Sequence, residues 1–267
     1  TERWRHAVAA DADGTLRLTE SALFVADRPG VLSCFGRVGD GTVSEPVWSA
    51  PVGDSPYGVS PAGDILLGVS TGEPAVWALD AAGGAELWRT PTVRTAQTSV
   101  VAMRFEKKAE APSAADPSSN VVKTVTRDVV LVGQSDGLSG FDLLDGRELW
   151  TVDCGSVRAI TACGETLAAC VTDDSNLVIV NVAAGREVAR HEGALPALTP
   201  VFAGDTLLFG AESSIEKVDM SQPEKEPKRW LRTSWIGHFT SSPVGADSLI
   251  FFTTDKRGLV CARASKR

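Results

Sequence analysis

The chain has 267 residues, 43% of them hydrophobic, and its formal net charge at pH 7 is −8. A chain of this length and hydrophobic content can bury a sizeable core, and all-β chains of this size routinely form one domain. The acidic balance argues against a nucleic-acid surface, which needs clustered Lys and Arg. No apolar run approaches the roughly 20 residues that cross a bilayer. We therefore predict no nucleic-acid partner and no membrane span.

One unit recurs along the chain. It consists of a short apolar strand, a small turn containing Gly, and a strand that ends in Glu, an apolar residue and Trp. The unit is clearest at 77–88 and 141–150, and a third copy at 180–188 has Val188 where the Trp would stand. A further apolar run precedes each unit, and in chain order these runs are 22–26, 65–69, 129–133, 166–170, 206–210 and 248–252. Such runs, bounded by turn residues, are typical of strands buried on both faces.

The units repeat about every 40 residues, as from Trp48 to Trp88. The interval from Trp88 to Trp150 is longer by about 20 residues, which are accounted for by an Ala-, Pro-, Ser- and charge-rich stretch at 106–120. This composition cannot build a core, so we predict a surface-loop insertion there. Without the insertion, the period is kept along the chain.

Four short strands in each period of about 40 residues predict the blade of a β-propeller. Five internal repeats and one composite repeat predict six blades of four antiparallel strands, in a single all-β domain over 1–267. The last repeat supplies only three strands before the chain stops, and residues 1–8 contain an isolated strand pattern around Trp4. We therefore predict that the N-terminal strand completes the last blade and closes the ring, which removes the exposed sheet edge.

The pattern Ala-x-Asp-x-x-x-Gly-x-Glu-Leu-Trp around Trp88, and its near copy around Trp150, resembles the repeat of pyrroloquinoline-quinone-like (quinoprotein alcohol dehydrogenase-like) propellers. The resemblance implies that a Trp of each outermost strand docks between adjacent blades and that the Gly allows the turn before it. The implied docking residues are Trp4, Trp48, Trp88, Trp150 and Trp230. WD-repeat propellers are the competing type, but the Gly-His start and Trp-Asp end of that repeat do not recur here.

Family members include quinone-dependent dehydrogenases, sensor domains, and an outer-membrane assembly lipoprotein that holds partner proteins. A catalytic member would show two adjacent Cys, which this chain lacks. Residues 11–14 look like the start of a Ca²⁺ loop, but the later ligands are missing. The three His lie far apart, without zinc-site spacing. We predict no catalytic residue, no metal and no cofactor, which favours a chain that is not an enzyme.

Function is then expected at the surface. The connections between blades and the turns between the two middle strands share one face of a propeller, and Tyr, Trp and Arg are typical anchors of protein interfaces. The binding residues predicted on this face are Tyr57, Arg94, Arg158, Trp235, His238 and Lys256. The alternative for Tyr57 and Trp235 is that they only pack between blades.

These observations predict a non-catalytic scaffold, sensor or auxiliary domain. Its partner would be another protein or other domains of the same polypeptide. The alternative is a quinoprotein-like unit that binds a cofactor or acts as an oxidoreductase. Five Cys without a framework spacing favour free thiols and hence a cytoplasmic location, with export to the periplasm or the extracellular space as the alternative.

Overall fold

The computed structural model describes residues 16–27, 30–36, 45–112, 120–246 and 249–263, in which nearly all regular structure is β-strand. The strands form six antiparallel sheets, five with four strands and one with three. The first three sheets comprise β1 (Leu16–Leu18), β2 (Ala22–Ala26), β3 (Val31–Gly36), β4 (Trp48–Pro51), β5 (Pro56–Ala62), β6 (Ile65–Ser70), β7 (Ala75–Asp80), β8 (Glu86–Pro91), β9 (Val101–Pro112), β10 (Asn120–Gly133), β11 (Gly137–Asp142) and β12 (Glu148–Asp153). The last three comprise β13 (Val157–Cys163), β14 (Leu167–Thr172), β15 (Asn176–Asn181), β16 (Arg186–Glu192), β17 (Val201–Ala203), β18 (Thr206–Ala211), β19 (Ser214–Asp219), β20 (Lys228–Arg232), β21 (Val244–Ala246), β22 (Leu249–Thr254) and β23 (Gly258–Arg263). Within these ranges the one helix is the single turn α1 (Thr233–Ile236).

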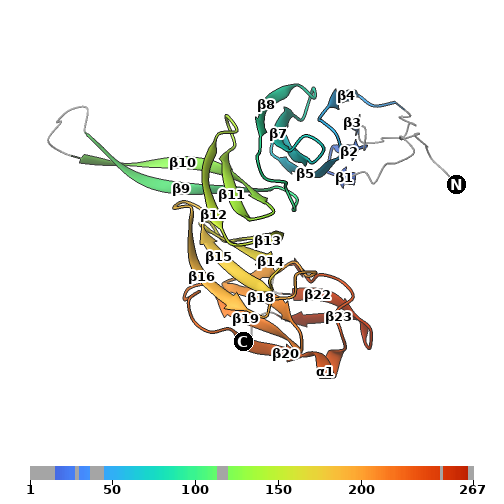
Figure 1. Cartoon of the computed structure of the whole chain (residues 1–267), viewed down its shortest axis with the longest axis vertical. Coiled ribbons are helices and arrows are strands. Elements are labelled where there is room, and N and C mark those ends of the chain that lie inside the picture. Colours follow the sequence, from blue (N-terminus) through green and yellow to red (C-terminus); the bar gives the residue numbers. More distant parts are fainter. Residues whose placement is uncertain (1–15, 28–29, 37–44, 113–119, 247–248, 264–267) are drawn as a thin grey trace.

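Each sheet pairs its strands in chain order, and we letter them A to D from the first strand to the last. The A strands β1, β5, β9, β13, β17 and β21 contact one another in that series. The A strands therefore line the inside of the molecule. Figure 1 shows the sheets following one another along a curved path, with the first and the last at its two ends. The predicted six blades are confirmed, with four strands in five of them.

The sixth blade has three described strands, β21, β22 and β23. The strand predicted to complete it, around Trp4 in residues 1–8, lies outside the described residues. Ring closure by the N-terminal strand therefore stays a prediction, as does the assignment of 1–267 to a single domain.

The B and C strands are apolar on both faces because each blade packs against a neighbour on either side. In β6, for example, Leu66, Leu67 and Val69 have no exposed surface. The hydrophobic clusters combine residues of adjacent blades, so that the cluster containing Leu131 and Val178 joins blades 3 and 4. The apolar runs predicted from the sequence coincide with B strands, and the core lies in the seams between blades.

The predicted surface-loop insertion at 106–120 differs in the structure. Strands β9 and β10 pair continuously from Leu131↔Val101 out to Asn120↔Pro112, and the hairpin projects from the blades (Figure 1). The inner part of β9 belongs to the core through Met103 and Phe105, which are both buried. Composition could not exclude strands, since a two-stranded ribbon pairs the inward-facing backbone groups with each other and leaves the outward-facing ones to water.

The tryptophans of the D strands lie near the beginning of these strands, not at the end as predicted. Trp88 is the third residue of β8, and Trp150 is the third residue of β12. In blades 2 to 5 the pairing of the C and D strands shifts by one residue at a bulge. The residues skipped by the shift are Leu87, Leu149, Val188 and Trp230.

This bulge corrects the alignment of the repeats. Trp88 pairs with Ala78, and in blade 4 the residue in the corresponding place is Ala189, which pairs with Ile179. The prediction that Val188 stands in the Trp position is therefore wrong by one residue. In blade 5 the corresponding residue is Leu231, and Trp230 occupies the bulged position instead. The sequence allows the same alignment for blade 4, because 185–189 matches 146–150 residue by residue with Ala189 in place of Trp150.

Candidate functional site

The D–A connections between blades and the B–C turns lie on one side of the propeller, which we name the front face. All six predicted binding residues fall in or beside these segments. Arg94, Trp235 and His238 lie in D–A connections, Tyr57 and Arg158 are the second residues of A strands, and Lys256 lies in the last B–C turn. The structure places these residues in three different environments.

Tyr57 belongs to the core. Its side chain packs against the hydrophobic cluster shared by blades 2 and 3, and its hydroxyl is buried without a hydrogen-bond partner among the described residues. Burial raises the pKa of this phenol. An anchor of an interface must be reachable by a partner, so the position of Tyr57 corresponds to the packing alternative.

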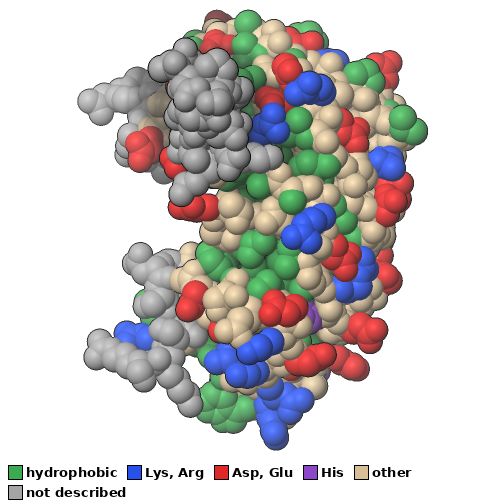
Figure 2. Space-filling model, turned by 90° about the vertical axis from the view of Figure 1, so that its left-hand side faces the viewer, with side chains coloured by type: hydrophobic (Ala, Val, Ile, Leu, Met, Phe, Trp, Pro, Cys, Tyr) green, Lys and Arg blue, Asp and Glu red, His purple; other side chains and the backbone are tan. Residues whose placement is uncertain are grey.

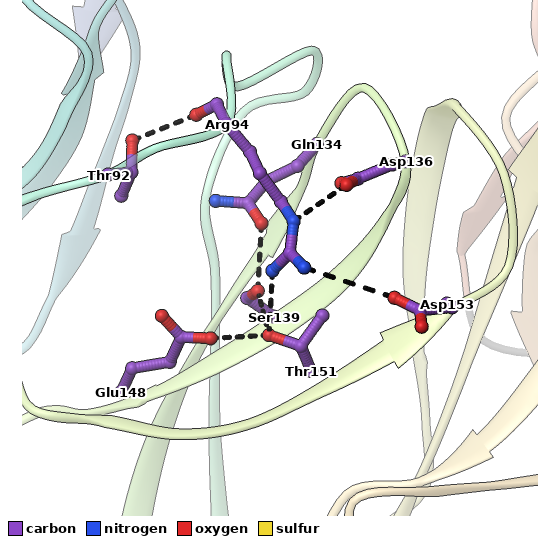
Figure 3. Close-up of polar contacts among 8 residues, drawn as sticks. All are labelled: Thr92, Arg94, Gln134, Asp136, Ser139, Glu148, Thr151 and Asp153. Atoms are coloured by element: carbon purple, nitrogen blue, oxygen red, sulfur yellow. Dashed lines mark hydrogen bonds and ion pairs between the residues drawn. The ribbon is translucent and has the colours of Figure 1, made fainter.

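Arg94 lies at the centre of a polar network between the second and third blades (Figure 3). Its Nε donates to Asp136 Oδ2 at 2.7 Å, a terminal nitrogen donates to Thr151 Oγ1 at 3.4 Å, and the other lies 4.0 Å from Asp153 Oδ1. All three partners belong to blade 3, whereas Arg94 lies on the connection that leaves blade 2. The guanidinium therefore ties this connection to the next blade.

The network continues into the interior of the blade. Thr151 donates to Glu148, and Ser139 Oγ lies 2.8 Å from Gln134 Oε1 and 2.7 Å from Thr151 Oγ1. A cleft of about 590 Å³ lies over the outer part, lined by residues 91–95, Gln134 to Asp136, and Glu148. One guanidinium faces the carboxylates of Asp136, Glu148 and Asp153, so the positive charge of Arg94 is more than balanced within the cleft.

Arg158 is also engaged within the chain. Its Nε forms an ion pair with Asp173, and a terminal nitrogen donates to Gln97 Oε1 at 3.3 Å. The hydrogen bond from this guanidinium, together with one from Ser156, lowers the pKa of Asp173. Gln97 lies on the same connection as Arg94. The two arginines therefore hold neighbouring segments of the front face in place.

Trp235 has a contrasting environment. It is 66% exposed and lies in α1, on the connection between blades 5 and 6. The guanidinium carbon of Arg257 lies 5.6 Å from the centre of its ring, within the range of a cation–π contact. Ile236, the next residue, is buried and holds the turn in place. The indole is thus held on a fixed backbone with its ring largely in solvent.

His238 lies on the same connection as Trp235. Lys256 lies in the last B–C turn, next to the Arg257 that contacts the tryptophan ring. The His238 backbone N–H donates to Asp255 Oδ1 at 2.8 Å, and its Nδ1 lies 3.2 Å from Oδ2. These hydrogen bonds lower the pKa of Asp255. The neighbouring Lys256 is exposed and has no ion-pair partner among the described residues. We name Trp235, His238, Asp255, Lys256 and Arg257 the Trp235 patch.

Charge is mixed elsewhere on the surface. Figure 2 shows the hollowed side of the molecule, where acidic and basic side chains are interspersed around a central group of hydrophobic ones. On this side no broad field of one sign stands out among the described residues.

The seams between blades have a repeated contact of their own. Trp48 Nε1 donates to the Ala81 carbonyl at 3.2 Å, and Trp88 Nε1 donates to the Leu143 carbonyl at 2.8 Å. Each acceptor lies in the C–D turn of the following blade. A Gly with positive φ in the turn lies against the indole, and the pairs are Gly84 with Trp48, Gly146 with Trp88 and Gly185 with Trp150. Trp4 lies outside the described residues, and the half-buried Trp230 packs on the core of blades 5 and 6.

The seam between blades 4 and 5 uses a residue that the sequence did not single out for this role. His191, in the D strand β16, is 7% exposed, and its Nε2 lies 2.8 Å from the Pro223 carbonyl in the C–D connection of blade 5. A carbonyl oxygen only accepts, so Nε2 carries the hydrogen. Ala189, in the Trp position, has no side-chain donor. His191, two residues further along the strand, supplies the hydrogen bond to the next blade instead. The sequence signal is the Glu-apolar-Ala variant at 187–189, which lacks the Trp whose indole donates across the seam in the earlier blades.

The described part of the chain holds no group of three or more His, Cys, Asp or Glu side chains arranged to bind a metal ion. None of its helical segments combines the length and the apolar character needed to cross a membrane. The predicted absence of metal and cofactor stays a prediction.

Six blades, with a D-strand Trp resting on the Gly turn of the next blade in three of the seams, define the class: a β-propeller of pyrroloquinoline-quinone-like repeats. The chain belongs to the family described as "Outer membrane protein assembly factor BamB", whose model matches residues 1–266. The family resemblance inferred from the repeat is thereby confirmed, and the non-catalytic branch is consistent with it.

Solved structures agree on the fold. BamB from Moraxella catarrhalis is 14% identical, with a TM-score of 0.64 over 96% of this chain and 71% of that one. The computationally designed Ika8 protein is 10% identical, with a TM-score of 0.62 over 93% of this chain and 70% of that one. At such identities the likeness concerns the fold alone. Comparison with curated proteins gave no match.

The expected cytoplasmic location is corrected by the family. Its description places BamB in the assembly of outer-membrane proteins, which favours the exported alternative. The cytoplasmic prediction relied on five Cys without a framework spacing. That argument was weak, because an absence of framework spacing does not exclude a single pair brought together by the fold.

Proposed function

We propose that this chain is a non-catalytic scaffold that binds a protein partner through its front face, with Trp235 as the main anchor. The observation that carries the proposal is the 66% exposure of Trp235 on a fixed turn. The indole lies in none of the hydrophobic clusters of the described residues, so folding alone does not account for its position. Trp and Arg are the residue types that most often dominate binding energy at interfaces.

The charges around this anchor indicate the chemistry of the partner. Lys256 is an exposed cation without an ion-pair partner within the described ranges, and Arg257 lies against the ring of Trp235. A partner surface with an apolar recess and one or more carboxylates beside it would complement the exposed indole and these two cations. The family description supports a protein partner, since it names an assembly factor.

Arg94 and Arg158 have a different part in this proposal. Both are engaged in ion pairs within the chain, so we assign them to holding the connections of the front face in position. The cleft beside Arg94, with its excess of carboxylates, suits a basic side chain of the partner better than an acidic one. The binding role first expected of these arginines is thus indirect.

The test begins with a partner recovered by chemical cross-linking in the native source and then purified. Its affinity is measured by titration against the wild-type chain and the Trp235→Ala variant. Loss of a central anchor costs about 2 kcal/mol or more, on the order of thirtyfold in affinity. Affinity unchanged by Trp235→Ala would overturn the assignment of the anchor.

Leu144→Ala is the matched control. Leu144 is 83% exposed and lies in a C–D turn on the opposite face, so its removal also deletes an exposed hydrophobic side chain. We expect the partner to bind this variant as it binds the wild-type chain. A loss with Leu144→Ala equal to that with Trp235→Ala would place the interface elsewhere or show a non-specific apolar effect. Both variants should keep the wild-type melting temperature.

A further inference from the structure

Two of the five cysteines face each other across the seam between blades 3 and 4. Cys154 directly follows the D strand β12, and Cys170 lies in the B strand β14 of the next blade. Their sulfur atoms are 3.9 Å apart, and the two residues are 3% and 0% exposed. The other three cysteines, Cys34, Cys163 and Cys261, have no such thiol neighbour.

The surroundings of this pair are apolar. The cluster that contains both cysteines also contains Leu138, Val152 and Val178, from the two blades that meet there. A bond between the sulfurs would therefore leave no polar partner unsatisfied. A disulfide requires a sulfur–sulfur distance of about 2.05 Å, so each sulfur must move by roughly 1 Å, within the reach of small side-chain rotations.

The two thiols differ in acidity. The contact with Cys170 and the charge of Arg190 lower the pKa of Cys154, whereas the same contact and burial raise the pKa of Cys170. Burial raises the pKa of the nearby Cys163 to about 12. In the packed seam, the Cys154 thiol is therefore the more acidic of the facing pair.

We propose that Cys154 and Cys170 form a disulfide bond that joins blade 3 to blade 4. The proposal depends on the geometry of the pair and on the exported location that the family favours, since disulfides persist in oxidising compartments. It does not depend on the proposed scaffold function. A bond here links two sheets that otherwise meet only through side-chain packing and connection contacts.

The oxidant is a disulfide, either that of a dithiol oxidoreductase or glutathione disulfide. The Cys154 thiolate attacks one of its sulfurs, the disulfide of the oxidant breaks, and one half leaves as a thiolate while a mixed disulfide forms on Cys154. Cys170 then loses its proton, attacks the Cys154 sulfur and releases the second half. Two protein thiols lose two electrons, and the oxidant becomes two thiols.

Burial decides when this exchange happens. With both sulfurs inaccessible in the folded chain, an oxidant reaches them only before blade 4 packs on blade 3, or when that seam opens. The bond therefore forms during folding. The experiment must include that stage.

The purified chain is unfolded, refolded with either glutathione disulfide or dithiothreitol, and alkylated under denaturing conditions. Tryptic cleavage separates Cys154, in 148–158, from Cys163 and Cys170, both in 159–186. We expect the glutathione-disulfide sample to contain the two peptides joined, with the loss of two hydrogens. Fragmentation between Cys163 and Cys170 should assign the link to Cys170. Alkylation of all five cysteines in that sample would overturn the proposal, as would a link to Cys163.

The bond should also raise the melting temperature. It closes a loop between positions 16 residues apart, for which the constraint on the unfolded chain raises the midpoint by roughly 5–10 °C. The difference between oxidised and reduced samples should vanish in Cys154→Ala and in Cys170→Ala and persist in Cys261→Ala. If the buried variants fold poorly, the peptide map of the wild-type chain decides alone. An oxidation-dependent shift retained in Cys170→Ala would also contradict the assignment.

Discussion

The seam between blades 2 and 3 and the connection between blades 5 and 6 use the same residue types for opposite purposes. In the seam, Trp88 is 8% exposed and its indole N–H bonds to Leu143, while Arg94 is paired with Asp136. In the connection, Trp235 is 66% exposed and Arg257 contacts its ring. The first Trp–Arg set joins two blades, and the second is held ready on the surface. Residue type alone therefore does not separate a Trp–Arg set docked in a seam from one exposed on the surface of this fold.

The largest effect that tests this contrast is expected from Trp88→Ala. Removing a docked indole leaves a cavity and an unpaired carbonyl, and truncations of large core residues cost about 3–5 kcal/mol of the free energy of unfolding. Trp235→Ala, which removes an exposed indole, should change that free energy by less than about 0.5 kcal/mol. Urea unfolding of both variants measures the difference. Equal losses would mean that Trp235 is also a packing residue.

A smaller loss is expected from Gly146→Ala, on the other side of the same seam. A Cβ at this position would come within 2.4 Å of Trp88 Cε3, and the φ of 71° disfavours side chains. Steric overlap and the left-handed backbone together should cost roughly 2–4 kcal/mol.

Gly204→Ala isolates the backbone part of that cost. Gly204 has a φ of 67° but no heavy atom within 4 Å of a Cβ placed on it, so this substitution should cost only about 1 kcal/mol. The two variants are compared by their urea midpoints. If both lose the same stability, the contact between Trp88 and the turn contributes nothing beyond backbone strain.

The smallest effect in the seam is expected from Arg94→Ala. Its ion pairs are solvent-accessible, with Asp136 52% and Asp153 85% exposed, and such pairs contribute little and are screened by salt. The loss in unfolding midpoint should be smaller than that of Gly146→Ala at low salt and should shrink at high salt. A large loss independent of salt would show that Arg94 is a packing residue in the manner of Trp88.

The fold was largely predictable from the sequence because a period of about 40 residues is repeated in apolar runs and in turn residues. Single-residue detail was not predictable. The motif at 185–189 already aligns Ala189, and not Val188, with Trp88 and Trp150, but the bulge beside it is visible only in the strand pairing. The stretch at 106–120 has a loop-like composition, and its part in β9 pairs with β10 through backbone contacts that composition does not reveal.

The sequence predicted the face on which the candidate binding residues lie, but not which of them are buried, exposed or engaged in ion pairs. Arg94 and Trp235 lie in D–A connections of the front face, and Arg158 lies beside one as the second residue of β13. The sequence could not show that Asp136 and Asp173 engage the two arginines, because these pairs join residues 42 and 15 positions apart. Nor could it show that Tyr57 is partly buried against the core and Trp235 largely exposed, since both are aromatic residues on the front face.

The contact of an indole with the glycine turn of the following blade has a consequence for how such a chain can be cut or lengthened. The first three seams each take a Trp from one blade and a Gly from the next, so the unit that holds these blades together spans the end of one sheet and the turn of the following one. A whole blade added at a D–A connection would bring one Trp and one Gly turn and leave every seam complete. Splitting the chain inside a C–D turn such as 81–85 would instead separate a Gly from its own sheet. Break points for circular permutation or split reporters therefore belong in the D–A connections.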